Sequence, residues 1–175
     1  MKGCVFLKKV FIIASIIIIL IISNKEHKEI VIPKDSIRIR VIANSNSLED
    51  QLLKLKVRDN ITKYLYKDLE NIKNISEARI NIENNLDKVD NIVSNTLNSD
   101  KYEINYGNNY FPEKKLNGIN YKEGNYESLV VNIGESQGNN WWCVLFPPLC
   151  MVEGTYKKSN KVEYKSKILE ILNKY

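Results

Sequence analysis

The segment at residues 37–59, IRIRVIANSNSLEDQLLKLKVRD, predicts a strand followed directly by a helix. Its first five residues alternate between apolar and basic side chains, the period-2 pattern of a strand with one buried face: Ile37, Arg38, Ile39, Arg40 and Val41. Residues 44–46 break the strand, and Ser47 is placed to cap a helix that has acidic residues in its first turn. A strand–helix unit of this kind indicates a mixed α and β domain.

Two amphipathic helices are predicted after this strand. The first carries an apolar stripe at helical spacing: Leu48, Leu53, Val57, Ile61, Tyr64 and Ile72. The second, after a short break, carries another: Ile75, Ala78, Ile82, Leu86, Val89 and Val93. We expect these helices to pack antiparallel on one face of the sheet.

The alternation of apolar and polar residues that is typical of a strand returns in the second half of the chain. It marks a strand with Tyr102, Ile104 and Tyr106, a turn at residues 107–109, and a stronger strand with Leu129, Val131 and Ile133. Residues 134–140 read as a loop, and a last helix is predicted from near Ser159 or Asn160, using Tyr164, Ile168, Leu172 and Tyr175. The predicted fold is therefore α+β: a single small domain with a short antiparallel sheet, a helical pair and a C-terminal helix.

The N-terminal part of the chain has the pattern of an export signal. Three lysines, Lys2, Lys8 and Lys9, precede or open an apolar run at residues 10–22. No small-residue cleavage pattern follows, so removal of the segment stays open. We expect residues 1–23 to be a signal peptide or signal anchor that contacts the membrane, residues 24–34 a tether, and residues 35–175 an extracytoplasmic domain.

Catalytic patterns are absent from the predicted domain. The one histidine, His27, lies in the tether, which excludes Ser-His-Asp, Cys-His and His-rich zinc sites. The glycines of residues 134–138 are not followed by the Lys-Ser/Thr of a phosphate-binding loop. The net charge of +5 comes largely from the two ends, without arginine-rich stretches, which argues against nucleic-acid binding. We expect a protein that is not an enzyme and has no catalytic residue, cofactor or metal.

The most unusual stretch is NNWWCVLFPPLCM at residues 139–151, which holds both tryptophans of the chain. Tryptophan is frequent in binding hot spots, and Pro147 with Pro148 disfavours a helix or a central strand. These features predict a stiff loop that presents a surface. The alternative is that Trp141 and Trp142 close the core, and one tryptophan could do each.

Cys143 and Cys150 flank the same stretch. In an exported chain such a pair is a candidate for a local disulfide that closes the loop. The alternative is two buried thiols that act as small apolar groups.

Residues 37–59 and residues 124–150, GNYESLVVNIGESQGNNWWCVLFPPLC, resemble the two signature segments of the stage II sporulation protein R family. Members of this family are made in the forespore of endospore-forming bacteria and exported to the space between the septal membranes. There they are required to activate a membrane-embedded aspartic protease of the mother cell, which processes the sigma-E precursor. The resemblance therefore implies a signalling protein whose partner is the extracytoplasmic face of that protease.

The resemblance also implies where contact would occur. We expect the partner-binding residues to be Arg58, Asn140, Trp141, Trp142, Phe146, Pro147 and Pro148. The chain lacks an Asp-Ser/Thr-Gly motif, which favours the activator over the protease itself. Two alternatives stay open: a peptidoglycan-binding or hydrolysing protein that uses both tryptophans as a sugar platform, and a septal anchor that works through its apolar N-terminus.

Overall fold

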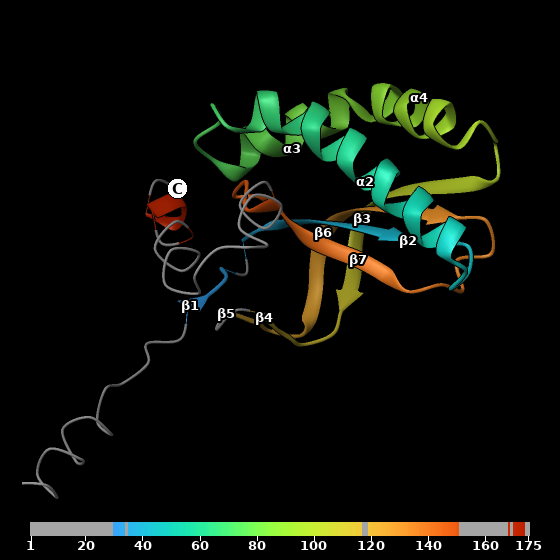
Figure 1. Ribbon diagram of the computed structural model, residues 1–175. Coiled ribbons are helices and arrows are strands. Elements are labelled where there is room, and N and C mark those ends of the chain that lie inside the picture. The colour runs from blue at the N-terminus through green and yellow to red at the C-terminus, as the bar shows by residue number, and fades with distance from the viewer. Residues whose placement is uncertain (1–29, 34, 117–118, 151–167, 169, 174–175) are drawn as a thin grey trace, which may run out of the picture.

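The computed structural model describes residues 30–33, 35–116, 119–150, 168 and 170–173. In this part the chain forms an α+β domain, which confirms the predicted fold class. The elements are β1 (Ile30–Val31), β2 (Ile37–Ile42), α2 (Leu48–Leu69), α3 (Ile75–Asn84), α4 (Leu86–Leu97), β3 (Tyr102–Phe111), β4 (Lys114–Leu116), β5 (Ile119–Tyr121), β6 (Gly124–Ile133) and β7 (Asn140–Phe146). The three helices cover one face of the main sheet, and β1, β4 and β5 lie below the other face (Figure 1).

The main sheet has four strands in the order β3-β6-β2-β7. Strand β6 pairs antiparallel with β3 but parallel with β2, while β7 pairs antiparallel with β2. The prediction of an antiparallel sheet was therefore wrong for the central pair. A parallel pair needs a long crossover, and here the chain passes through the helical layer and β3 to β5 before β6 begins.

Helix α2 begins as predicted. The Ser47 hydroxyl accepts a hydrogen bond from the Asp50 backbone N–H at 3.1 Å, the contact of an N-cap. The second predicted helix is instead divided at Asn85 into α3 and α4. The buried Asn85 amide donates to the Asn81 carbonyl at 2.8 Å and accepts from the Tyr64 hydroxyl at 2.7 Å, so its side chain competes with the helix and ties the break to α2.

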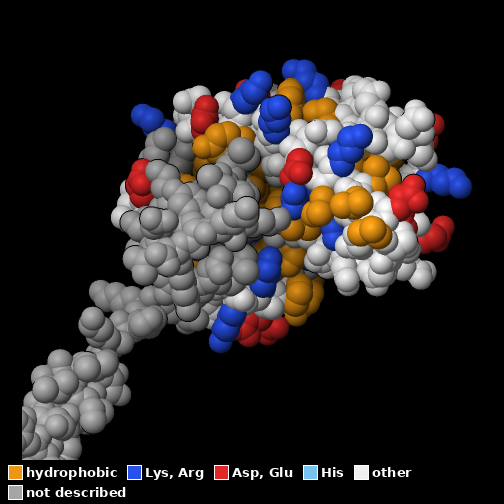
Figure 2. All heavy atoms as spheres, viewed as in Figure 1, with side chains coloured by type: hydrophobic (Ala, Val, Ile, Leu, Met, Phe, Trp, Pro, Cys, Tyr) orange, Lys and Arg blue, Asp and Glu red, His pale blue; other side chains and the backbone are white. Residues whose placement is uncertain are grey.

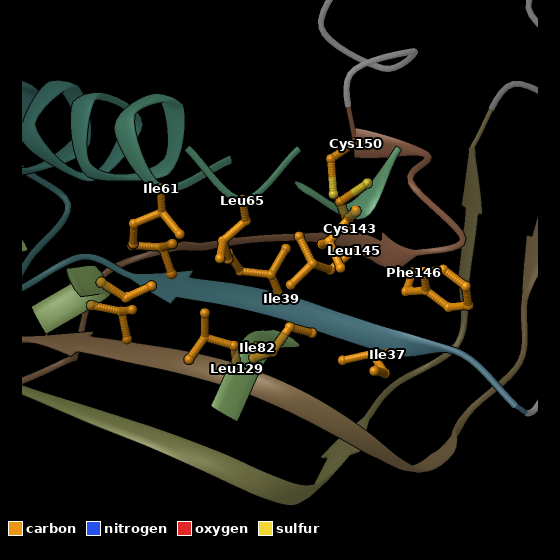
Figure 3. Close-up of a cluster of buried hydrophobic side chains, with 14 of the residues drawn as sticks. Ile37, Ile39, Ile61, Leu65, Ile82, Leu129, Cys143, Leu145, Phe146 and Cys150 are labelled. Carbon is orange, nitrogen blue, oxygen red and sulfur yellow. The ribbon is translucent and has the colours of Figure 1, made fainter. Parts of the chain in front are cut away.

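The larger core lies between the helices and the main sheet. Side chains on one face of β2 and β6 are fully buried there: Ile37, Ile39, Val41, Leu129 and Val131. Figure 3 shows Ile61 and Leu65 of α2 directed toward Ile39. Burying such side chains stabilises the fold by about 1.5–3 kcal/mol each, which makes this layer the main source of stability.

The opposite face of β2 was predicted to be polar and solvated, and this was wrong for Arg38, which is 0% exposed. A second cluster covers that face, with Phe111, Tyr121, Tyr126 and Trp142 among its buried members. The small sheet, in the order β1-β5-β4, lies on this side. Alternation alone did not reveal a second covering layer, because its strands are only two or three residues long.

Strand β3 is longer than the sequence suggested. Residues 107–109 were predicted to turn the chain, yet they continue β3, because all ten residues of β3 pair with β6. The connection between these strands contains the antiparallel pair of β4 and β5. Strand β1 and the buried Ile32 also lie inside the stretch expected to be a tether.

Two predicted segments fall mainly outside the described residues. The apolar N-terminal segment lies wholly outside them, and the start of the last helix does too; Ile168 and residues 170–172 are helical, and Ile168 is buried. In the described part of the chain, none of the helices has both the length and the apolar character that crossing a membrane requires.

Candidate functional site

The loop at residues 43–47 and the connection at residues 134–139 lock together where β7 begins. Four hydrogen bonds join them, each from a backbone N–H of the connection to an oxygen of the loop: Gln137 to Asn44 O (3.1 Å), Gly138 to Ala43 O (2.9 Å), Glu135 to Asn44 Oδ1 (3.0 Å) and Asn139 to Asn46 Oδ1 (2.7 Å). The two segments that carry the family resemblance therefore meet in space and fix the start of β7.

Two glycines make this close approach possible. A Cβ atom on Gly138 would overlap the Ser45 carbonyl group, and one on Gly134 would overlap the Asn44 side chain. Gly134 also has φ +55°, a conformation that other residues adopt only with strain. Residues 134–139 form a loop, as predicted, and these two glycines leave room for the neighbouring loop.

Helix α2 also holds the start of β7 in place, through a contact with Asn139. The buried Lys54 ammonium group donates to the Asn139 carbonyl at 2.9 Å and to the Gln51 side chain at 2.5 Å. Burial lowers the pKa of Lys54, with a smaller contribution from the Arg58 charge. The first half of α2 thus lies along the start of β7.

The tryptophan-bearing stretch is a strand and not the predicted loop. Residues 140–146 form β7, which is the edge strand of the main sheet, so Pro147 and Pro148 follow a strand rather than exclude one. Only Asn140 is exposed and Trp141 half-buried; the remaining predicted contact residues of this stretch are buried, namely Trp142, Phe146, Pro147 and Pro148.

Trp141 and Trp142 lie on opposite faces of the sheet, as successive strand residues must. Trp141 packs against the core beneath the helices, and Trp142 belongs to the second cluster. Trp142 meets Phe111 and Tyr121 edge-on, with ring centroids 5.2 and 5.4 Å apart. The two rings cannot form one sugar-stacking platform, so that version of the peptidoglycan alternative was wrong.

The structure brings together two residues that the sequence had singled out separately. The Arg58 guanidinium carbon lies 5.2 Å from the centroid of the Trp141 ring, and Arg58 also pairs with the Asp59 carboxylate at 2.6 Å. The Arg58 side chain is 14% exposed, so most of it is held against its neighbours. A half-buried tryptophan beneath an oriented arginine is a rigid feature at the surface, of the kind found in binding hot spots.

Exposed leucines lie on the same half of α2, and sequence reasoning missed their importance. Leu48 is 76% exposed and Leu52 is 58% exposed. They line an open hollow of about 520 Å³ with Glu49, Leu53 and Lys56. Figure 2 shows hydrophobic side chains at the beginning of α2, with Lys and Arg side chains beside them. Leu48 had been predicted to lie on the apolar stripe that packs on the sheet, and this was wrong. The available signal for Leu52 was that it lies off the helical stripe of Val57 and Ile61.

We call Leu48, Leu52, Arg58, Asn140 and Trp141 the α2–β7 surface. It combines exposed apolar groups, a stacked arginine and an edge strand on rigid elements. Such a surface is suited to binding another protein, and it contains no arrangement of acid, base and nucleophile.

Cys143 and Cys150 are both buried. Their sulfur atoms lie 3.7 and 3.0 Å from the Val144 carbonyl oxygen, and Figure 3 shows both side chains next to Leu145. The Leu149 backbone N–H donates to the same oxygen at 3.2 Å, which folds the chain back after the two prolines. The disulfide between Cys143 and Cys150 stays a prediction.

The clearest polar cluster elsewhere joins α3 to β6. Arg79 donates to both carboxylate oxygens of Glu127, at 2.8 and 2.7 Å, and the Tyr106 hydroxyl donates to the same carboxylate at 2.6 Å. The Arg79 bonds lower the pKa of Glu127, and burial raises the pKa of Tyr106. Because both of its carboxylate oxygens accept hydrogen bonds from these side chains, Glu127 links β6 to α3 and β3.

Among the residues that the structure describes, no three His, Cys, Asp or Glu side chains are grouped so that they could hold a metal ion.

Comparison with known proteins gives consistent matches. The model of the family described as stage II sporulation protein R matches residues 33–156. The chain is 35% identical over 134 residues to a protein of Bacillus subtilis (strain 168) named stage II sporulation protein R. That match covers 74% of this chain and 60% of the relative, so the chain spans less than two thirds of its length. No solved structure matches the fold.

Proposed function

Because this chain belongs to the stage II sporulation protein R family and so has a role in sporulation, we propose that it is an exported signal that activates the membrane-embedded aspartic protease of the mother cell. In this proposal the chain leaves the forespore, reaches the space between the septal membranes, and binds the extracytoplasmic face of the protease. The bound protease then processes the sigma-E precursor. The N-terminal apolar segment directs export, and it either is removed or holds the domain at the membrane.

The observation that carries the proposal is the α2–β7 surface. Leu48 and Leu52 expose apolar area that the domain does not use for its own core. Lys54 bonds to Asn139 and Arg58 stacks on Trp141, so the half of α2 that carries Leu48 and Leu52 is held against the start of β7. An activator must recognise its partner through contacts of this kind, since it contributes no chemistry of its own.

The rigidity of this surface also supports signalling by contact. The hydrogen bonds between residues 43–47 and 134–139 fix the start of β7 before a partner arrives. A preordered surface loses little conformational entropy on binding, so more of the contact energy favours one state of the partner. We therefore propose a revised contact set, in which Leu48 and Leu52 join Arg58, Asn140 and Trp141, and the buried Trp142, Phe146, Pro147 and Pro148 support them from within.

Processing of the sigma precursor in a non-sporulating bacterial host tests this proposal. The host would contain the protease and its precursor substrate, and would export residues 24–175 from a cleavable signal. We expect processing with the wild-type chain, and a loss of about tenfold or more with Leu52→Glu or Trp141→Ala, as for hot-spot residues. Ile80→Glu is the matched control, because Ile80 is an apolar residue 57% exposed on α3, outside the α2–β7 surface.

Exported amounts of each variant would be compared by immunoblot. Absence of processing with a well-exported wild type would contradict activation by this domain. Equal processing by Leu52→Glu, Trp141→Ala and Ile80→Glu would contradict the assignment of the surface.

A further inference from the structure

Arg38 is the least expected residue of the core. It lies at the centre of the second cluster with 0% exposure, on the face of β2 opposite to the helices. Tyr126 stacks on it, with the ring centroid 3.4 Å from the guanidinium carbon. Phe111 and Trp142 stand farther out, each with its centroid at 5.0 Å. The cation is therefore enclosed by aromatic rings.

The hydrogen-bonding capacity of this guanidinium is largely unused. Its Nη2 donates to the Lys122 carbonyl at 3.4 Å, which is a long contact. Its Nε and Nη1 are buried and have no acceptor among the residues that the structure describes. Because Tyr126 occupies one face of the guanidinium plane, the unused N–H groups point outward within that plane, where a planar acceptor binds arginine best.

A second arginine, Arg40, contacts the same aromatic cluster. Arg40 follows two residues later on the same face of β2, and its guanidinium carbon lies 4.0 Å from the Phe111 centroid. Its Nη2 donates to the Tyr110 carbonyl at 2.5 Å, while its Nε is buried without an acceptor. Burial lowers the pKa of both arginines, and the charge of Arg40 contributes to the shift of Arg38.

The cluster contains a third cation and lacks a described counter-charge. The Lys114 ammonium group lies 4.6 Å from the Trp142 centroid. Among the described residues, each ion pair involves other side chains, and no carboxylate contributes to the pKa of either arginine. A fully buried cation beside a partly buried one is unfavourable unless an anion joins them, although stacking on aromatic rings offsets part of the desolvation.

We propose that Arg38 and Arg40 form a binding site for one carboxylate group. The carboxylate lies in the plane of the Arg38 guanidinium and accepts from an unused N–H group of each arginine. Arg40 and Lys114 are partly exposed, so the ligand enters past them. Because Tyr126 stacks on the face of the Arg38 guanidinium, we expect a planar carboxylate in the guanidinium plane to bind better than a tetrahedral phosphate. The site is on the face of the sheet opposite to Trp141 and is separate from the α2–β7 surface.

The arginine side-chain NMR spectrum of the full chain in detergent micelles tests this site. The sequence has four arginines, Arg38, Arg40, Arg58 and Arg79, so the Nε–Hε region contains four signals that single Arg→Lys variants assign. Sodium acetate would be titrated against sodium chloride and sodium phosphate at equal ionic strength. Arg58 and Arg79 are internal controls, because their Nε groups already donate to Asp59 and Glu127.

We expect acetate to shift the Arg38 and Arg40 signals in a saturable way, without moving the two controls. If acetate has no effect but the variants Glu153→Gln or Glu163→Gln move the same two signals, the site exists and takes a carboxylate of this chain. The proposal is overturned if the four signals drift together as they do in chloride, if phosphate shifts Arg38 more than acetate does, or if neither acetate nor the glutamine variants moves Arg38.

A further variant, Arg38→Met, distinguishes loss of the site from loss of folding. Arg38→Met keeps the length and apolar stem of the side chain and removes the buried charge. We expect this variant to unfold at the same or a higher urea concentration than the wild type and to lose the acetate shift at Arg40. An acetate shift at Arg40 that persists in Arg38→Met would contradict a shared site.

Discussion

Adjacent tryptophans on opposite faces of one strand should differ sharply in their effect on stability. Trp142 is 5% exposed and is surrounded by Phe111, Tyr121 and the Arg38 guanidinium. Trp141 is half-buried and stacks under Arg58. The perturbation is the replacement of each tryptophan by alanine, one at a time, in the fragment of residues 24–175.

The expected magnitudes follow from burial. Removing a fully buried aromatic side chain destabilises a domain by about 3–5 kcal/mol, and the edge-on contacts of Trp142 place it in that range. Trp141→Ala removes fewer contacts and should destabilise by about 1–2 kcal/mol. For a domain of this size, each kcal/mol lowers Tm by about 2–4 °C, so Trp142→Ala should lower Tm by roughly 10 °C.

Urea unfolding followed by far-UV circular dichroism measures both losses without relying on tryptophan fluorescence. Trp142→Phe is the matched control: it keeps an aromatic ring beside Arg38 and should fall between wild type and Trp142→Ala. A loss for Trp141→Ala equal to or larger than that for Trp142→Ala would refute the assignment of the two tryptophans to different faces.

Three further predictions concern the loops, the polar tie and the cysteines. Gly138→Ala should destabilise the domain by about 1–3 kcal/mol in urea unfolding, because its Cβ would overlap the Ser45 carbonyl. Gly107→Ala is the control and should change stability far less, because its Cβ would lie 3.7 Å from its nearest neighbour. Equal losses of stability would refute the close approach of the two loops. The pKa of Glu127 is lowered in the folded state, so its pairing with Arg79 stabilises the fold above the unfolded-state pKa, and this stabilisation is lost as pH falls through the lower folded-state pKa. On acidification, the urea midpoint of Glu127→Gln should therefore fall less than that of the wild type. Parallel pH profiles of the two proteins would contradict this. In chain recovered from an oxidising compartment, we expect Cys143 and Cys150 to form a disulfide, seen by mass spectrometry as the loss of two hydrogen atoms that reductant restores; thiols that both react with an alkylating reagent after denaturation would contradict it.

Local patterns in the sequence were sufficient to predict most of the helices and strands that form the larger core. Ser47 marked the start of α2 because a cap depends on neighbours three residues away. The predicted stripe of α2 correctly placed Val57 and Ile61 in the larger core, and the alternation in β6 did the same for Leu129, Val131 and Ile133. The stripe was wrong for Leu48, which is exposed, and it missed the buried Leu65 and Leu69. The interruption at Asn85 was missed, because it depends on a hydrogen bond from Tyr64, which is distant in the sequence.

Features that depend on long-range pairing could not be predicted. The prolines at 147 and 148 suggested a loop, but β7 is an edge strand that ends before them, and its edge position is set by β2. Arg38 looked solvated because the residues that enclose it, Phe111 and Tyr126, lie on strands more than 70 positions later. For the candidate site, the sequence identified Trp141 and Arg58 but not the leucines beside them, since exposure of an apolar residue on a helix is known only when the helix is placed.

Site-specific photo-crosslinking tests the central claim, direct contact between the α2–β7 surface and the protease, most directly. A photoreactive amino acid would replace Leu52 in one exported variant and Ile80 in another, in a host that contains the protease, and processing would confirm that each variant is active. Leu52 is exposed on the α2–β7 surface, and Ile80 is similarly exposed on α3. The account predicts a crosslink to the protease from position 52 and none from position 80. Active protein that gives no crosslink from position 52, or equal crosslinks from both positions, would contradict it.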